Sequence, residues 1–202
     1  MAVNLSKPRN LLPVPGVRLA ATSSGVKGDR DDLALAVFDP AAVVAGVYTQ
    51  SAFAAPPVWV AKERERTARG WLANSGNANA ATGEPGRIDA VDLCQRAAAV
   101  LELESNSLQP FSTGVIGERL PMDKLLAAIP RLATSLEPDN WLEFASAIMT
   151  TDTVAKAVSE QVNIDGEAIT VTGVAKGSGM IKPNMATMLG YIACNATVSG
   201  EV

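Results

Sequence analysis

The sequence predicts an α/β fold of the α+β kind, in which layered mixed sheets carry helices on their outer side. Three observations predict it. Short apolar runs fill the first third of the chain, helical periodicity replaces them in the middle, and alternation returns near the end. Strands, then helices, then strands are typical of such layered arrangements. With 202 residues, 48% of them apolar, the chain is long enough for one substantial core.

The first part of the chain is read as strands. Its apolar runs are short and are separated by Gly, Pro and Asp, which punctuate sheets. The predicted strands span residues 17–21, 33–38, 43–49, 58–61 and 71–74.

Three helices are predicted next. Residues 89–103 place apolar side chains along one helical stripe behind Asp89, which is a favourable capping residue type. A second helix is expected to begin near Pro121, with Leu125, Leu126 and Ile129 inward, and to be bent or ended by Pro130. A third is expected behind Asp139 and Asn140, with Trp141, Phe144 and Ile148 as core anchors.

A hairpin is predicted in residues 162–177. The alternating residues Val162, Ile164, Ile169 and Val171 flank an Asp165-Gly166 pair. Asp-Gly between alternating arms is the strongest short-range hairpin signal. The second arm leads directly into KGSGMIKPNMATMLGYI, residues 176–192.

Charge and composition argue against several classes of protein. Seventeen basic and twenty-one acidic residues give a formal charge of −4, so binding to nucleic acid or to an anionic membrane is not favoured. The N-terminus lacks a secretory pattern, and no apolar run approaches the about 18 residues of a membrane span, so a cytoplasmic location is expected. Cys94 and Cys194 lack metal-ligand spacing and are expected to be reduced, with no metal bound.

The chain contains no histidine. A serine or cysteine nucleophile served by an imidazole base is therefore excluded within it, as is a zinc site built on histidines. In any acyl transfer by this chain, a group other than histidine must therefore act as the general base.

Three glycine-rich loops are candidates for phosphate sites. Residues 74–86, 112–117 and 176–180 follow apolar runs, yet none contains GxxxxGK[ST] or GxGxxG, so a nucleotide site is poorly supported. Tight turns with positive φ are the simpler interpretation of Asn74, Asn77 and Asn79.

Taken in order, the loops and their neighbours carry a family resemblance. The segments GVRLAATSSGVK, GVYTQSAFAAPPV, NSGNANAATG, STGVIGERLPMDK, AIMTTDT and AKGSGMIKPNMATML resemble the ornithine acetyltransferase family of arginine biosynthesis, also called glutamate N-acetyltransferase. The resemblance covers nearly the whole chain. Two departures are Ala81, where a cysteine is often found, and TDTVAK, which lacks a common proline. The fold it implies is a self-processing architecture like that of N-terminal nucleophile enzymes.

The resemblance implies that a precursor cuts its own chain between Ala186 and Thr187. Residues 1–186 then form the alpha-chain region, a single domain, and residues 187–202 begin the beta-chain region. The freed α-amine of Thr187, with an ordinary pKa of about 7.7 to 8.0, would serve as base for its own hydroxyl. Without the resemblance, a threonine here indicates only strand propensity.

The implied reaction moves an acetyl group from N2-acetylornithine to glutamate through an acetyl-Thr187 intermediate. The resemblance places the oxyanion hole at the Thr113 hydroxyl and the Gly114 N–H, and substrate contacts at Thr153, Lys176 and Thr187. It implies no cofactor, and leaves open whether acetyl-CoA also serves as a substrate. Without the family resemblance, residues 112–114 are interpreted as an ordinary turn and Lys176 as a solvent-exposed lysine at a strand end.

The expected assembly is an α2β2 heterotetramer of the two processed halves. Only fifteen residues follow Thr187, whereas the family precursor is about twice this length, so most of the second half is expected to be absent. An inactive truncated fragment therefore remains an alternative. A self-cleaving aminopeptidase of the same architecture is another, although such an enzyme generally uses serine where Thr187 stands.

Overall fold

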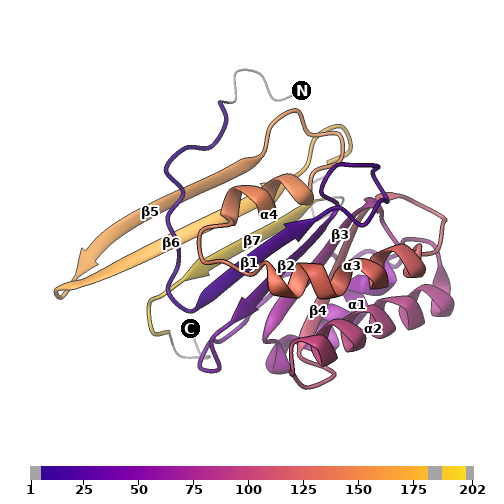
Figure 1. Ribbon diagram of the computed structural model, residues 1–202, viewed down its shortest axis with the longest axis horizontal. Helices are drawn as coiled ribbons and strands as arrows, with labels where there is room; N and C mark the ends of the chain where they lie inside the picture. The colour runs from indigo at the N-terminus through magenta and orange to yellow at the C-terminus, as the bar shows by residue number, and fades with distance from the viewer. Residues whose placement is uncertain (1–5, 182–187, 199–202) are drawn as a thin grey trace.

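The structure is a computed structural model that describes residues 6–181 and 188–198. Its strands form two sheets, one with the order β1-β2-β3-β4 and one with the order β5-β6-β7 (Figure 1). The strands are β1 (Val17–Thr22), β2 (Leu33–Phe38), β3 (Gly70–Asn77), β4 (Leu108–Val115), β5 (Lys156–Ile164), β6 (Glu167–Lys176) and β7 (Leu189–Cys194). The helices are α1 (Pro56–Glu63), the short 3-10 helix η1 (Glu65–Thr67), α2 (Gly83–Val100), α3 (Met122–Thr134) and α4 (Trp141–Ala147).

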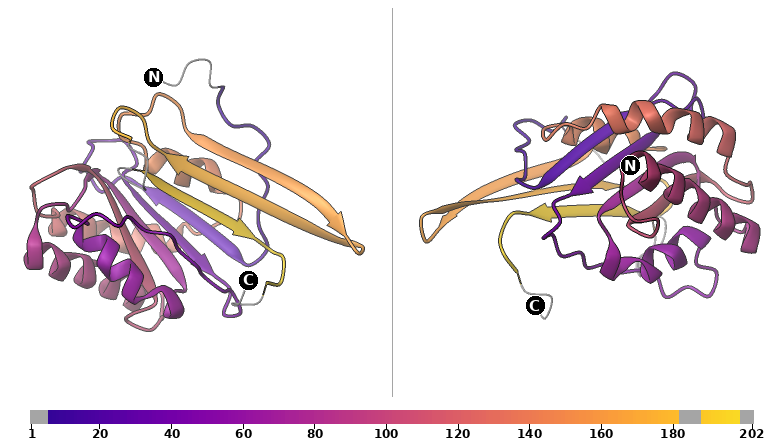
Figure 2. Two further views of the ribbon diagram at one scale, coloured as in Figure 1. Left: turned by 180° about the vertical axis from the view of Figure 1, so that it is seen from behind. Right: turned by 60° about the horizontal axis from the view of Figure 1, so that its bottom comes forward.

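The predicted layered α/β architecture is confirmed. Helices α2 and α3 cover one face of the first sheet, and their apolar side chains form a core with Leu33, Leu35 and Leu72. The opposite face packs against α4 and the second sheet through a second core that includes Trp141, Phe144 and Tyr191. The turned view in Figure 2 shows these layers, with the β5-β6 hairpin extending beyond the rest of the molecule.

The first sheet is mixed. Strands β1, β2 and β3 pair antiparallel, whereas β3 and β4 pair parallel and are joined by α2. The carboxyl ends of two parallel strands meet at one edge of a sheet. The ends of β3 and β4 therefore lie side by side, with Ser75 opposite Thr113 and Gly76 opposite Gly114.

The hairpin prediction is confirmed. β5 and β6 pair antiparallel along their whole length, and Val162 lies opposite Ile169. Asp165 and Gly166 connect the strands with φ values of 53° and 90°, as a two-residue turn with positive φ at both positions requires.

Two predicted strands are wrong. Residues 43–49 form no strand, and Val43 and Val47 are largely exposed. Residues 58–61 lie inside α1, where Pro56 and Pro57 occupy the first turn and Val60 and Ala61 face the core. An apolar run of four residues has no period of its own, so tertiary packing decides between strand and helix.

Some helix boundaries also differ. Helix α2 begins at Gly83, so Asp89 lies within it and does not cap it. Helix α3 continues through Pro130 to Thr134. Proline removes one helix hydrogen bond, but beyond it Leu132 is completely buried and Arg131 donates to the Thr22 hydroxyl, which stabilise the last turn.

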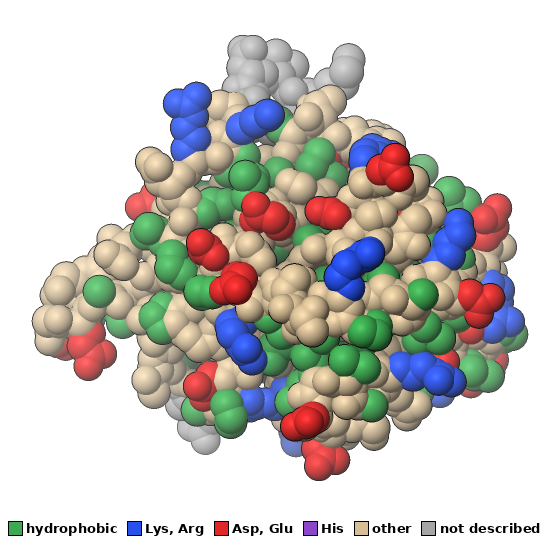
Figure 3. Space-filling view, viewed as in Figure 1, with side chains coloured by type: hydrophobic (Ala, Val, Ile, Leu, Met, Phe, Trp, Pro, Cys, Tyr) green, Lys and Arg blue, Asp and Glu red, His purple; other side chains and the backbone are tan. Residues whose placement is uncertain are grey.

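The molecular face in Figure 3 carries basic and acidic side chains interspersed with apolar ones. Within residues 6–181 and 188–198, no helix is both long and apolar enough to cross a membrane.

Candidate functional site

Thr113 and Gly114 stand at the carboxyl end of β4, where the structure brings several polar side chains together. Thr113 is 8% exposed, whereas Gly114 is exposed. These residues therefore form the end of a strand, and the alternative interpretation of residues 112–114 as an ordinary turn is wrong.

Gly114 lies against the backbone of β3. A Cβ atom at position 114 would fall 2.3 Å from the Gly76 carbonyl carbon and 2.6 Å from the Asn77 nitrogen. The φ of Gly114 is 135°, which L side chains rarely adopt. Only glycine therefore fits this position without moving the neighbouring strand.

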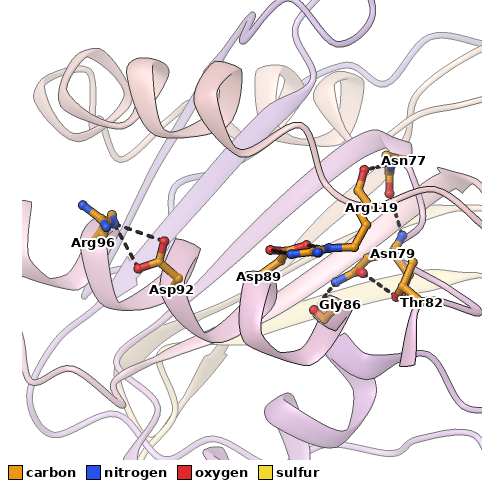
Figure 4. Close-up of polar contacts among 8 residues, drawn as sticks. All are labelled: Asn77, Asn79, Thr82, Gly86, Asp89, Asp92, Arg96 and Arg119. Carbon is orange, nitrogen blue, oxygen red and sulfur yellow. Dashed lines mark hydrogen bonds and ion pairs between the residues drawn. The ribbon is translucent and has the colours of Figure 1, made fainter. Parts of the chain in front are cut away.

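The loop after β4 is held by Asn77. The Asn77 Nδ2 donates to the carbonyl oxygens of Arg119, at 2.9 Å, and Glu118, at 3.2 Å. Its Oδ1 accepts from the Asn79 N–H at 2.7 Å, so one side chain joins the two loops that follow β3 and β4 (Figure 4). Backbone hydrogen bonds from Ala78 to Val115 and from Gly117 to Ala80 reinforce the junction.

Side chains at the start of α2 extend this network. The Thr82 hydroxyl donates to the Asn79 Oδ1 at 2.7 Å, and the Asn79 Nδ2 donates to the Gly86 carbonyl at 2.8 Å. The Arg119 guanidinium meets the buried Asp89 carboxylate in two hydrogen bonds of 2.6 Å each (Figure 4). The Asp89 carboxylate is also the main reason that the pKa of Arg119 is raised.

The interpretation of the asparagines as positive-φ turn residues holds for Asn79 alone, whose φ is 46°. Asn74 and Asn77 are buried within β3 and act through their side chains. The Asn74 Oδ1 accepts from the Ser112 hydroxyl at 2.6 Å, and its Nδ2 donates to the Asn77 carbonyl at 2.8 Å. A signal for this role was their place at the end of a buried strand, but nothing in the sequence named their partners.

Lys176, the last residue of β6, crosses from the second sheet to Thr113. Its Nζ donates to the Thr113 Oγ1 at 2.9 Å, and the lysine is 4% exposed. The interpretation of Lys176 as a solvent-exposed lysine is therefore wrong. Burial lowers the pKa of Lys176, while the nearby Asp152 carboxylate acts to raise it.

Asp152 holds the segment next to Lys176. The Asp152 Oδ1 accepts from the Gly177 N–H at 2.9 Å and from the Lys156 ammonium, and the Asp152 side chain is fully buried. Burial by itself would raise the pKa of Asp152, but the hydrogen bonds from Lys156 and Gly177 outweigh it, and the pKa lies below its ordinary value.

Lys27 is a further cation at this end of the sheet, and it is partly buried. Its Nζ donates to the carbonyl oxygens of Met149, at 2.9 Å, and Ala147, at 3.2 Å. The buried Asp32 carboxylate fixes the loop around Lys27 by accepting the Val26 and Lys27 N–H groups. Burial lowers the pKa of Lys27, with smaller contributions in the same direction from Arg30 and Lys176.

The other predicted site residues are less closely joined to Thr113. Thr153 follows Asp152 in the turn before β5 and is exposed. Ala186 and Thr187, the predicted cleavage site and nucleophile, lie outside the described residues. Within the part of the chain that the structure describes, no group of three or more Cys, Asp or Glu side chains is placed to hold a metal ion.

A cavity of about 890 Å³ opens next to these residues. Neither Thr113 nor Lys176 lines it, but their chain neighbours Ser112 and Ala175 do, as does Met188. Tyr48, Trp71, Phe111 and Tyr191 provide aromatic walls, while Gln109 and Lys156 provide polar groups. Apolar walls with a few polar groups are typical of sites for small molecules.

Comparison with known proteins yields one family. Residues 18–202 match the sequence model of the ArgJ family. The arginine biosynthesis bifunctional protein ArgJ of Pseudomonas syringae pv. tomato is 48% identical over the full chain, and that of Colwellia psychrerythraea is 46% identical over 98% of it. The chain spans about half the length of these curated relatives, 50% and 51% respectively.

Two solved structures have the same fold. The arginine biosynthesis bifunctional protein of Bacillus halodurans is 39% identical, with a TM-score of 0.80 over 86% of this chain and 92% of the matched one. The ornithine acetyltransferase of Mycobacterium tuberculosis, solved in complex with ornithine, is 35% identical, with a TM-score of 0.73 over 85% and 92% of the two chains.

Proposed function

The chain belongs to the ArgJ family, and from that premise we propose that it forms the first half of an acetyltransferase of arginine biosynthesis. The proposed enzyme moves the acetyl group of N2-acetylornithine to glutamate. The names of the relatives and the ornithine complex of one of them support this substrate class. The observation that carries the proposal is the Thr113-Gly114 strand end, built against β3 and touched by Lys176 beside a cavity of about 890 Å³.

We propose that Thr187 is the nucleophile and that the chain is cut before it. The Thr187 hydroxyl attacks the Ala186 carbonyl carbon, the peptide C–N bond breaks, and the amine takes the proton, leaving an ester. Water then hydrolyses the ester to a carboxylate on Ala186 and a free Thr187. The new α-amine supplies a base next to the hydroxyl in a chain that contains no histidine.

Chain lengths support this division. The chain covers about half of the curated relatives but 92% of each matched chain in the solved structures. These two coverages are expected if the proteins of known structure consist of two chains, and if the first of these chains corresponds to most of the sequence described here.

In the proposed transfer, the Thr187 Oγ attacks the acetyl carbonyl of N2-acetylornithine, and ornithine leaves with the proton on its amine. The amine of glutamate then attacks the acetyl ester, giving N-acetylglutamate and restoring the hydroxyl. Each tetrahedral intermediate carries an oxyanion, which the Thr113 hydroxyl and the Gly114 N–H are proposed to bind. Loss of one such donor typically costs about 3 kcal/mol of barrier. No cofactor takes part in these steps, and Thr153 is proposed as a further substrate contact.

The second half of the protein is proposed to cover the outer face of β5-β7. On that face Val158, Val171 and Ile192 are 62%, 38% and 72% exposed, whereas the opposite face buries Thr172, Val174 and Tyr191. β7 is an edge strand of this sheet. The occupant that fits is the part of the curated relatives' length, about half, that lies outside the span matched by this chain. Two such pairs would give the proposed α2β2 heterotetramer.

The reaction is tested with the full-length protein, meaning this chain together with the proposed second half. It is incubated with N2-acetylornithine, with and without glutamate. Formation of N-acetylglutamate together with ornithine is expected only when glutamate is present. Release of ornithine at the same rate without glutamate would indicate hydrolysis, as in the aminopeptidase alternative. A parallel incubation of acetyl-CoA with glutamate decides whether the enzyme also accepts that donor.

The nucleophile is tested by intact-mass analysis of the same full-length protein. Two fragments divided between Ala186 and Thr187 are expected. Thr187→Ala should remain uncut and inactive, while Thr187→Ser, which keeps a hydroxyl, should still be cut. Acetyl transfer by an uncut polypeptide would contradict the assignment of Thr187.

A further inference from the structure

The hydrogen bond between Lys176 and Thr113 joins two residues that come from different sheets. The Lys176 Nζ lies 2.9 Å from the Thr113 Oγ1, and the two residues are 4% and 8% exposed. Among the residues that the structure describes, Thr113 is the hydrogen-bond partner of the Lys176 Nζ. Both partners are thus directed at each other inside the protein, away from bulk water.

The direction of this hydrogen bond restricts the Thr113 proton. A lysine ammonium is only a donor, whereas a threonine hydroxyl has one hydrogen to donate and two lone pairs that accept. Because Lys176 occupies a lone pair, the Thr113 hydrogen is free to point to another acceptor. Donation from a cation also polarises the hydroxyl and makes it a stronger donor.

We infer that Lys176 is a positioning residue that acts through Thr113, orienting and polarising the hydroxyl that stabilises the oxyanion. The inference rests on the proposed acetyl transfer. It differs from the expectation that Lys176 contacts the substrate directly, for which the lysine would need to direct its ammonium to the ligand.

The surroundings of Lys176 fit a fixed orienting group. The Asp152 carboxylate, with its side chain fully buried, accepts the N–H of Gly177 at 2.9 Å and so anchors the residue that follows Lys176. Asp152 also places a negative charge near the ammonium. The other nearby cations are engaged elsewhere, because Lys156 pairs with Asp152 and Lys27 donates to the Ala147 and Met149 carbonyls.

A double-mutant cycle tests the inference in the full-length protein. Lys176→Met removes the donor while keeping a long side chain, Thr113→Val removes the hydroxyl while keeping the shape, and the third variant combines them. Acetyl transfer is measured as kcat and as KM for both substrates, with rates divided by the fraction of protein cut before Thr187. Lys124→Met, an exposed lysine on α3, is the matched control and should retain wild-type kcat.

We expect Thr113→Val to lower kcat by about 100-fold or more. Lys176→Met should also lower kcat, with little change in KM. The kcat of the double variant should be no more than about threefold below that of Thr113→Val, since the effects of residues that act as one unit are not additive. Effects that multiply in the double variant would overturn the inference. A raised KM with an unchanged kcat in Lys176→Met would also overturn it, since that indicates a substrate contact.

Lys176→Gln keeps the test open if the methionine variant does not fold. Its amide N–H is still a donor to Thr113, so kcat should lie nearer the wild-type value than that of Thr113→Val does. A kcat equal to that of Thr113→Val, or a raised KM with normal kcat, would count against the inference. Absence of transfer by the wild-type protein would instead overturn the proposed function itself.

Discussion

Gly114 faces Gly76 across the carboxyl ends of β4 and β3, so closely that a Cβ at position 114 would lie 2.3 Å from the Gly76 carbonyl carbon. No side chain separates the two strands at this point. The Gly114 N–H is thereby held at a fixed place beside Thr113, which is what a preorganised oxyanion donor requires.

Gly114→Ala should therefore lower the free energy of unfolding more than Gly117→Ala does. We expect it to lower the free energy of unfolding by about 3 kcal/mol, because the new methyl group overlaps backbone that cannot move independently. Gly117 also has positive φ, 89°, but has open space around it, so Gly117→Ala should cost about 1 kcal/mol. Thermal denaturation compares the two, and equal losses would contradict the role given to the Gly76 contact.

The Asp89-Arg119 ion pair should contribute more to stability than the Asp92-Arg96 ion pair on α2. Asp89→Ala leaves the Arg119 guanidinium without its two charge-assisted hydrogen bonds and frees the loop that Asn77 also holds. The exposed pair of Asp92 and Arg96 is the matched control, for which Asp92→Ala should cost about 0.3 to 0.5 kcal/mol (Figure 4). The Asp89 variant should show the larger fall in melting temperature. Identical melting curves for the two would contradict this expectation.

Asp152 should stabilise the protein in a pH-dependent manner. Its pKa is lowered in the folded protein, so the ionised form contributes stability that is present above the ordinary carboxyl pKa of about 4 and is lost as the pH falls through the lowered folded value. Asp152→Asn lacks this contribution. The difference in free energy of unfolding between wild type and variant should therefore be constant near neutral pH and shrink below about pH 4. A difference that grows on acidification would show the opposite sign of the pKa shift.

The two cysteines should differ sharply in reactivity. Burial raises the pKa of Cys94 to about 12, and the thiolate is the nucleophilic form, so Cys94 should resist iodoacetamide at pH 8 until the protein unfolds. Cys194 is exposed on the outer face of β7 and should be alkylated in the chain studied alone. Mass spectrometry of the peptides measures both.

The same reagent tests the proposed position of the second half. In the full-length protein, Cys194 should become protected, because it lies on the sheet face that bears Val171 and Ile192. Equal alkylation of Cys194 in the short chain and the full-length protein would place the second half elsewhere.

Local sequence patterns are sufficient to predict the elements that have a clear period or a specific turn. β2, the β5-β6 hairpin at Asp165-Gly166 and the helix beginning at Trp141 follow from local patterns, because alternation, turn chemistry and helical spacing each act over a few residues. The ordered motifs likewise predict the family, and the family match over residues 18–202 confirms it. The strand predicted at residues 58–61 is wrong because four apolar residues fit either a strand or a helix.

The contacts between distant polar groups, in contrast, follow only from how the chain folds in three dimensions. Lys176 and Thr113 are 63 residues apart, and the Asn77 amide holds carbonyls more than 40 residues away. Such contacts depend on strand order and on the parallel pairing of β3 with β4, which local periodicity does not encode. Packing of the two sheets also buried Lys176, since a strand-end lysine in an isolated hairpin would remain in water.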